Sequence, residues 1–207
     1  MSQILLNTAY FPNIQYMSKF VAYDKVIIEV NDTYAKQTYR NRCVIYSANG
    51  SLPLSIPVIK NNRTAVKDVQ IDYIEDWQKA HYRAILSAYK NSAYYDFIYP
   101  DFENIFIKKE KFLIDLNNKI LDLIFDSFGF EKNYQFTDDY IKNPDCLDFR
   151  DKIHPKKSKN FNDSSFKQAK YYQVFEEKYG FIENLSVLDL LFNEGPIGLK
   201  ILQESIV

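Results

Sequence analysis

The first thirty residues show two apolar runs on either side of an amphipathic stretch. Residues 3–7 and 25–30 are short and rich in aliphatic side chains, and they predict two buried strands. Between them, apolar residues at positions 14, 17, 20 and 21 recur at helical spacing. A strand–helix–strand order with a connection of this length predicts a right-handed βαβ unit, in which the two strands are parallel neighbours.

The next apolar runs are separated by turn residues. Residues 42–46 and 52–59 flank Asn49-Gly50, a pair that is typical of hairpin turns. Residues 66–71 alternate between apolar and polar side chains. These patterns predict an antiparallel hairpin with a somewhat longer loop, followed by one further strand.

Helical periodicity dominates the second half of the chain. Residues 77–89 place Trp77 and His81 on one face, and residues 110–128 carry a broad apolar stripe that ends at Gly129. Further helical patterns cover residues 166–179, 186–192 and 197–203. The order of elements predicts an α/β fold over residues 1–207: a single domain with a mixed sheet opened by the βαβ unit, flanked by helices and with a helical C-terminal region.

One long segment has no periodicity. Residues 143–165 are polar, rich in lysine and contain two prolines. We expect a polar loop here, and we interpret it as a candidate lid in which Lys156 and Lys157 can close over an anion.

Composition narrows the class of protein. The 207 residues carry 46% hydrophobic and 26% charged side chains, which is ordinary for a folded soluble chain, and the net charge of −1 disfavours a globally basic nucleic-acid binder. Cys43 and Cys146 lie far apart and match no metal-ligand spacing, so we expect neither a disulfide scaffold nor a metal site. Without a signal-peptide pattern or an apolar run of about 20 residues, the chain is predicted to be cytoplasmic, with no membrane span.

Residues 33–67 depart from the average charge. They contain six basic residues and no acidic one. If residues 34–42 are extended, alternate side chains line one face, and these are Tyr34, Lys36, Thr38, Arg40 and Arg42. Arginine binds phosphate or carboxylate at two points, so this row predicts a site for a phosphorylated or nucleotide-linked small molecule. The alternative is a solvated strand paired to acidic neighbours.

The expected topology places other candidate groups nearby. Ligands of open parallel sheets bind beyond the carboxyl ends of the strands, where the first strand delivers Tyr10 and the second delivers Glu29. The chain has no GxGxxG or Walker loop, which argues against a standard dinucleotide or P-loop site.

The two histidines have competing interpretations. His81, on the helix face with Trp77, is either a hydrogen-bonded structural residue or a general acid or base at the edge of the crevice. His154, in the polar loop, is either an exposed loop residue or a contact to an anion.

Several motifs resemble those of the WbqC-like protein family. They are Thr8–Pro12, residues 33–42 (TYAKQTYRNR), Asn49-Gly50, Ile56–Val58, Trp77 with His81 and Tyr89, Tyr172–Phe175, and residues 184–196 (NLSVLDLLFNEGP). The resemblance extends over nearly the whole chain. The chain is similar to the short form of the family that is common in Bacteroidetes. In place of the Gln-Pro-containing motif that often begins longer members stands Asn7-Thr8-Ala9.

The resemblance implies a role in making surface polysaccharides. It implies a cytoplasmic enzyme that modifies a nucleotide- or lipid-linked (amino)sugar of O-antigen or lipopolysaccharide, by acyl or aminoacyl transfer, with no cofactor specified. Whether the chain is an enzyme stays open, because a non-catalytic ligand-binding or assembly protein of the same pathway is the alternative. An RNA binder fits the acidic composition least. The candidate residues are Glu29 and His81 for catalysis, and Tyr10, Tyr34, Lys36, Arg40, Arg42 and Lys156 for substrate binding.

Overall fold

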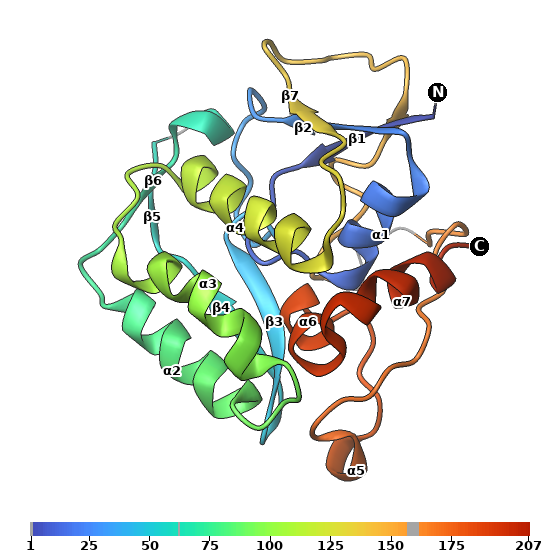
Figure 1. Ribbon diagram of the computed structural model, residues 1–207. Helices are drawn as coiled ribbons and strands as arrows, with labels where there is room; N and C mark the ends of the chain where they lie inside the picture. Colours follow the sequence, from blue (N-terminus) through green and yellow to red (C-terminus); the bar gives the residue numbers. More distant parts are fainter. Residues whose placement is uncertain (1, 62, 157–161) are drawn as a thin grey trace.

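A four-stranded parallel sheet forms one end of the molecule (Figure 1). The computed structural model describes residues 2–61, 63–156 and 162–207. The strand order is β7-β2-β1-β8, with β1 (Gln3–Asn7), β2 (Lys25–Glu29), β7 (Tyr134–Phe136) and β8 (Leu147–Asp148). Strands β1 and β2 pair in parallel from Gln3↔Lys25 to Asn7↔Glu29. The predicted βαβ unit is therefore confirmed.

Helix α1 (Ile14–Ala22) makes the crossover between β1 and β2. It begins at Asn13, whose side-chain Oδ1 accepts a hydrogen bond from the Tyr16 N–H at 2.9 Å, as an N-cap does. All residues from Ile14 to Phe20 are buried. The crossover helix is thus a core element, packed against the C-terminal helices α6 (Val187–Glu194) and α7 (Gly198–Glu204).

The antiparallel strands form sheets of their own. Strands β3 (Arg42–Ser47) and β4 (Gly50–Ser55) make the hairpin expected around Asn49-Gly50, with Gly50 at a φ of +91°. Strands β5 (Val58–Ile59) and β6 (Gln70–Ile71) pair separately, around the short 3-10 helix η1 (Val66–Asp68). The α/β fold class is confirmed. The parallel sheet does not take in these strands, because β7 and β8 occupy its two edges.

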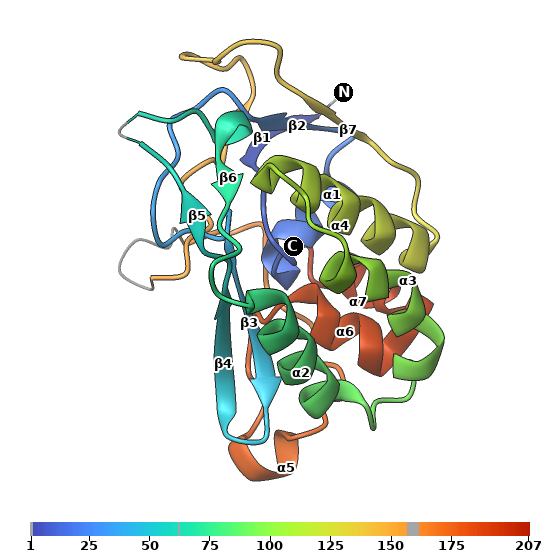
Figure 2. The same cartoon turned by 90° about the vertical axis from the view of Figure 1, so that its left-hand side faces the viewer.

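The helices pack on the hairpin and on one another (Figures 1 and 2). Helix α2 (Trp77–Tyr89) and helix α6 both contact β3. Helix α3 (Tyr95–Ile107) contacts both α2 and α4 (Leu113–Phe128). The predicted C-cap of α4 is confirmed, since Gly129 is left-handed with a φ of +64°. Much of the core between these helices is aromatic, including the stacked pair of Tyr95 and Tyr99.

The predicted loop at residues 143–165 contains a strand. Its residues 147–148 form β8 and pair in parallel with β1, and both Phe149 and Ile153 are buried. This part of the segment belongs to the sheet edge. The lid role stays a prediction, and Lys157 lies outside the described residues.

The helix predicted over residues 166–179 is wrong except for its last turn, α5 (Glu176–Tyr179). Tyr171 and Gln173 are two residues apart, and both reach the same carboxylate oxygen, Oδ2 of buried Asp189, at 2.7 and 3.0 Å. Side chains at i and i+2 share a direction in an extended chain but not in a helix. The buried carboxylate on α6 therefore favours the extended backbone seen here.

We expect Gly195→Ala to destabilise the fold more than Gly180→Ala. Both glycines have positive φ, +58° and +73°, so alanine is strained at either position. A Cβ on Gly195 would lie 2.5 Å from the Tyr94 ring, whereas one on Gly180 meets nothing within 4 Å. Urea unfolding should show a loss of about 1–2 kcal/mol for Gly180→Ala and roughly 1–3 kcal/mol more for Gly195→Ala. Equal losses would contradict the packing seen around Gly195.

Candidate anion-binding site

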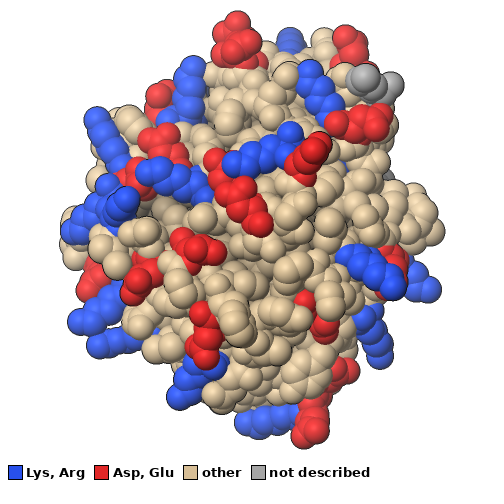
Figure 3. Space-filling view, in the orientation of Figure 1, with Lys and Arg blue, Asp and Glu red and all other residues tan. Residues whose placement is uncertain are grey.

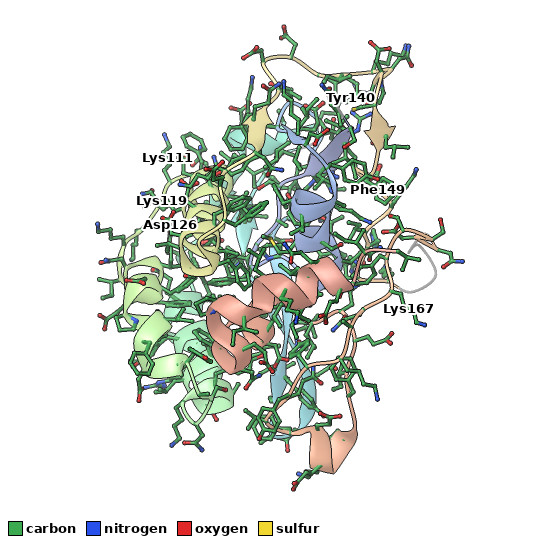
Figure 4. The ribbon with its side chains drawn as sticks, turned by 45° about the vertical axis from the view of Figure 1, so that its right-hand side comes forward. Lys111, Lys119, Asp126, Tyr140, Phe149 and Lys167 are labelled. Atoms are coloured by element: carbon green, nitrogen blue, oxygen red, sulfur yellow. The ribbon has the colours of Figure 1, made fainter. Side chains whose placement is uncertain are left out.

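The carboxyl ends of β1, β2 and β8 meet at one edge of the parallel sheet. Asn7 is the last residue of β1, Glu29 the last of β2, and Asp148 the last of β8. Loops that follow such strands are where open sheets bind ligands. The chain after β8 carries Phe149, and the β7–β8 connection carries Tyr140, and both are labelled in Figure 4.

Glu29 is fully buried and surrounded by donors. Its Oε1 accepts from the Asn31 N–H and the Thr137 hydroxyl, both at 2.8 Å, and its Oε2 accepts from the Ile141 N–H at 3.0 Å. The guanidinium of Arg150 lies 3.5 Å from Oε2. Glu29 therefore ties the end of β2 to the chain after β7 and to the chain after β8, with both oxygens occupied.

Arg150 is the second arm of this cluster. Its Nε and Nη2 bind Asp148 at 3.0 and 2.6 Å, and its Nη1 donates to the Ile141 carbonyl at 2.8 Å. The Tyr140 ring lies 5.3 Å from its guanidinium carbon. Hydrogen bonding to Asp148 raises the pKa of Arg150. Sequence reasoning missed this residue, because its partners come together only when β8 pairs with β1.

Arg40 is the other guanidinium at this edge, and it is poorly satisfied. Its side chain is 2% exposed, yet its closest acidic partner is Asp32, whose Oδ2 lies 3.5 Å from Nη2. Its Nε is buried with no hydrogen-bond acceptor among the described residues. Burial lowers the pKa of Arg40, an effect that the negative charges of Asp151 and Asp32 oppose.

The backbone around Arg40 is held in place. The Tyr10 N–H donates to the Tyr39 carbonyl at 2.9 Å, and the Asn117 side chain donates to the Arg40 carbonyl at 2.8 Å and to the Thr8 hydroxyl at 3.1 Å. These contacts come from the loop that follows β1 and from α4, so two segments far apart in sequence fix one turn.

A small cavity lies at this point. It has a volume of about 20 Å³ and is lined by Asn7, Thr8, Ala9, Tyr16, Thr38, Tyr39, Arg40, Phe149, Arg150, Asp151, Ile153 and His154. That volume holds about one water-sized group. Arg150 is already bound by Asp148, so Arg40 is the guanidinium with hydrogen-bonding capacity left to offer in this cavity.

The predicted single row of cations is wrong. Residues 36–40 form turns rather than an extended strand, and Gln37 has a left-handed φ of +59°. Lys36 is consequently exposed on the turn. Arg42 begins β3, where its Nε donates to Ser55 Oγ at 3.0 Å, and it does not line the small cavity.

Tyr34 lies close to both arginines. Its ring is buried beneath the Lys60 ammonium, which lies 5.7 Å from the ring centroid. Burial raises the pKa of Tyr34 to about 12, and the nearby charges of Arg40 and Arg42 oppose that rise. Tyr34 therefore lies near both arginines, but of these three residues Arg40 alone is in the lining of the small cavity.

Tyr10 and His81 form a buried pair of their own. The Tyr10 oxygen lies 2.9 Å from His81 Nδ1, and the Trp77 ring packs edge-on against His81 with centroids 5.2 Å apart. Burial lowers the pKa of His81 to about 4, against a hydrogen bond to the Ser55 backbone that raises it. None of the described hydrogen-bond partners of His81 is also a partner of Glu29, and neither residue lines the small cavity.

The candidates of the polar loop are at the surface. Lys156 is exposed, and its backbone N–H donates to His154 Nδ1 at 3.0 Å. His154 lines the small cavity beside Arg40. Elsewhere charges of both signs are interspersed, as on the face drawn in Figure 3.

Among the described residues, no group of three or more His, Cys, Asp or Glu side chains is arranged to hold a metal ion. No helix within residues 2–61, 63–156 and 162–207 has the length and apolar character needed to cross a bilayer.

Comparison with known proteins adds a family. The model of the WbqC-like protein family matches residues 8–153, which include Arg40, Arg150 and all residues of the small cavity except Asn7 and His154, and which stop before the C-terminal motif. The uncharacterized protein Rv1507c of Mycobacterium tuberculosis is 24% identical over a 216-residue alignment that covers 90% of this chain and 88% of that protein. No solved structure matches the chain significantly.

The low pKa of His81 predicts an acid-sensitive fold. A buried imidazole that stays neutral to about pH 4 binds fewer protons than the unfolded chain, so stability is complete above about pH 6.5 and falls as the pH drops from there toward 4. Between pH 7.5 and 4.5 we expect the wild type to lose about 2–3 kcal/mol more than His81→Gln. Urea unfolding of both proteins at the two pH values measures this difference. Parallel losses, with an NMR pKa of His81 near 6.5, would show that its ring is accessible.

Proposed function

The chain belongs to the WbqC-like protein family, and on that premise we propose that it binds a phosphorylated, nucleotide- or lipid-linked (amino)sugar at the small cavity beside Arg40, which we call the Arg40 cavity. The family takes its name from a gene of an O-antigen cluster. The proposed setting is the cytoplasmic stage of surface polysaccharide synthesis, and the proposed reaction is an acyl or aminoacyl transfer to the sugar.

Arg40 is the observation that carries this proposal. A buried donor without an acceptor costs about 1–3 kcal/mol, more when the group is charged, and Arg40 bears that cost at its Nε. A phosphate oxygen in the cavity would accept from Nε and answer the charge, in the two-point manner for which guanidinium is suited. The location at the carboxyl edge of parallel strands supports the same conclusion.

The other substrate candidates take secondary positions in this proposal. Tyr34 and Arg42 lie near Arg40 and would contribute to the positive potential, and Lys36 and Lys156 would contribute from the surface. Tyr10 would act indirectly, because its ring is fully buried while its backbone N–H holds the turn that carries Arg40.

A non-catalytic binding protein of the same pathway is the second candidate. One observation favours it: the two side chains proposed for acid–base work are already engaged, Glu29 by four donors and His81 by Tyr10 and the Ser55 backbone. A general base must be within hydrogen-bond reach of the proton it takes. Incubating a bound nucleotide sugar with acyl and aminoacyl donors, and following the sugar by mass spectrometry, separates the two. A mass increase supports the transferase, and unchanged sugar supports the binding protein.

We predict that Arg40→Met weakens sugar-phosphate binding without unfolding the protein. Losing hydrogen bonds to a charged group costs about 1.5–3 kcal/mol, so affinity should fall roughly 10- to 150-fold. The ligand-free variant should be as stable as the wild type or more so, since an apolar side chain removes a poorly answered buried charge. Calorimetry with nucleotide sugars found by a thermal-shift screen measures the affinity, and urea unfolding measures the stability.

Arg42→Met is the matched control. It removes the same charge two residues away, from a side chain that does not line the cavity, so affinity should change less than about threefold. Equal losses in both variants would mean that only the general positive charge matters. Unchanged binding by Arg40→Met would refute the proposed site.

A further inference from the structure

A much larger cavity adjoins the Arg40 cavity. It has a volume of about 1100 Å³ and shares two lining residues with the smaller one, Tyr39 and His154. Its other walls come from the hairpin, from the start of α1 and from residues that precede α6. A volume of this size is in the range of small-molecule sites, whereas the Arg40 cavity alone holds about one water-sized group.

The floor of the large cavity is an ordered set of amide and carboxylate groups. Asn184 has a left-handed φ of +58°, its Oδ1 accepts from the Gln15 N–H at 3.0 Å, and its Nδ2 donates to Gln15 Oε1 at 3.2 Å. Gln15 in turn donates to Asp163 Oδ2 at 3.0 Å. Because these groups are fixed by one another, they offer hydrogen bonds with little ordering cost on binding.

The charges that the described residues bring to the large cavity are balanced. Asp163 is paired with buried Lys19, which also donates to Ser165 Oγ at 3.0 Å. Among the described lining residues, the other ionic side chains are one acid and one base, Glu183 and Lys170. This contrasts with Arg40, whose Nε is unanswered. A second phosphate would find little net attraction here, so the balance favours an uncharged group.

Aromatic rings complete the walls. Tyr39, Phe166 and Phe181 all line the cavity, and Phe181 is held edge-on against Tyr171 with ring centroids 5.5 Å apart. Flat apolar faces next to amide groups suit a ring that has both C–H faces and hydroxyl edges.

We infer that the large cavity binds the hydroxyl-rich, uncharged ring of the ligand whose phosphate reaches Arg40, an inference that rests on the proposed function. The phosphate oxygen of the ligand fills the small cavity. The bond from the phosphate to the sugar passes between Tyr39 and His154, and the sugar ring occupies the space above Gln15 and Asn184. The large cavity then determines which sugar binds, and Arg40 selects for a phosphorylated sugar.

Filling the large cavity from outside tests this arrangement. Ser51 is exposed on β4 and lines the cavity, so Ser51→Trp blocks it without removing any described side-chain hydrogen bond. Ser87→Trp is the control, because Ser87 is exposed on α2, does not line the cavity and makes no described side-chain hydrogen bond. The probes are inorganic phosphate, glucose 1-phosphate and N-acetylglucosamine 1-phosphate, titrated by NMR.

We expect the wild type to bind at least one sugar phosphate about tenfold or more tightly than inorganic phosphate. In Ser51→Trp that advantage should shrink to less than about twofold while phosphate affinity stays the same, and Ser87→Trp should keep it. The inference is overturned if neither sugar phosphate is preferred, or if Ser51→Trp leaves the preference intact. Failure of the proposed function looks different: phosphate binding is then absent, or persists unchanged in Arg40→Met.

Discussion

A guanidinium group that is buried away from water needs hydrogen-bond acceptors and a negative charge nearby. At Arg40 the fold supplies these only in part. Its side chain is 2% exposed, its nearest carboxylate oxygen is 3.5 Å away, and its Nε has no acceptor among the described residues. Natural folds seldom leave such a donor without an acceptor, because desolvation of a charged group is among the larger single free-energy costs in a protein. The turn that carries Arg40 is nevertheless held by hydrogen bonds from the loop after β1 and from α4. The proposed site depends on this buried Nε–H of Arg40, which lacks an acceptor among the described residues.

Arg150 shows what a satisfied arginine looks like at the same sheet edge. It binds Asp148 at two points, donates to the Ile141 carbonyl and faces Glu29. That cluster joins the ends of β2 and β8 and is complete without a ligand. The difference between the two arginines separates the structural role of Arg150 from the binding role proposed for Arg40, although both line one cavity.

The sequence predicted the elements whose pattern is local. The strands at 3–7 and 25–29, the helix between them, the Asn49-Gly50 hairpin and the cap at Gly129 all follow from periodicity and turn chemistry over a few residues. The turn at 36–40 did not follow from the sequence, because nothing in these residues indicates that Gln37 becomes left-handed. Strand β8 and the extended run before α5 were missed because their partners, β1 and Asp189, are distant in the chain.

The same distinction holds for the site. Arg40 was found from the charge of its segment, while Arg150, Asp32 and the large cavity depend on pairings that only the folded chain makes. Glu29 and His81 were chosen for their chemistry, and the structure places them in separate hydrogen-bonded clusters.

The most direct measurement follows the Nε–H resonance of Arg40 by NMR during titration with N-acetylglucosamine 1-phosphate. The account predicts that this resonance shifts strongly and that its exchange with water slows as the donor gains an acceptor, while the Nε–H of Arg150, already bound to Asp148, barely moves. A ligand that binds with Arg40 unperturbed would contradict the central claim.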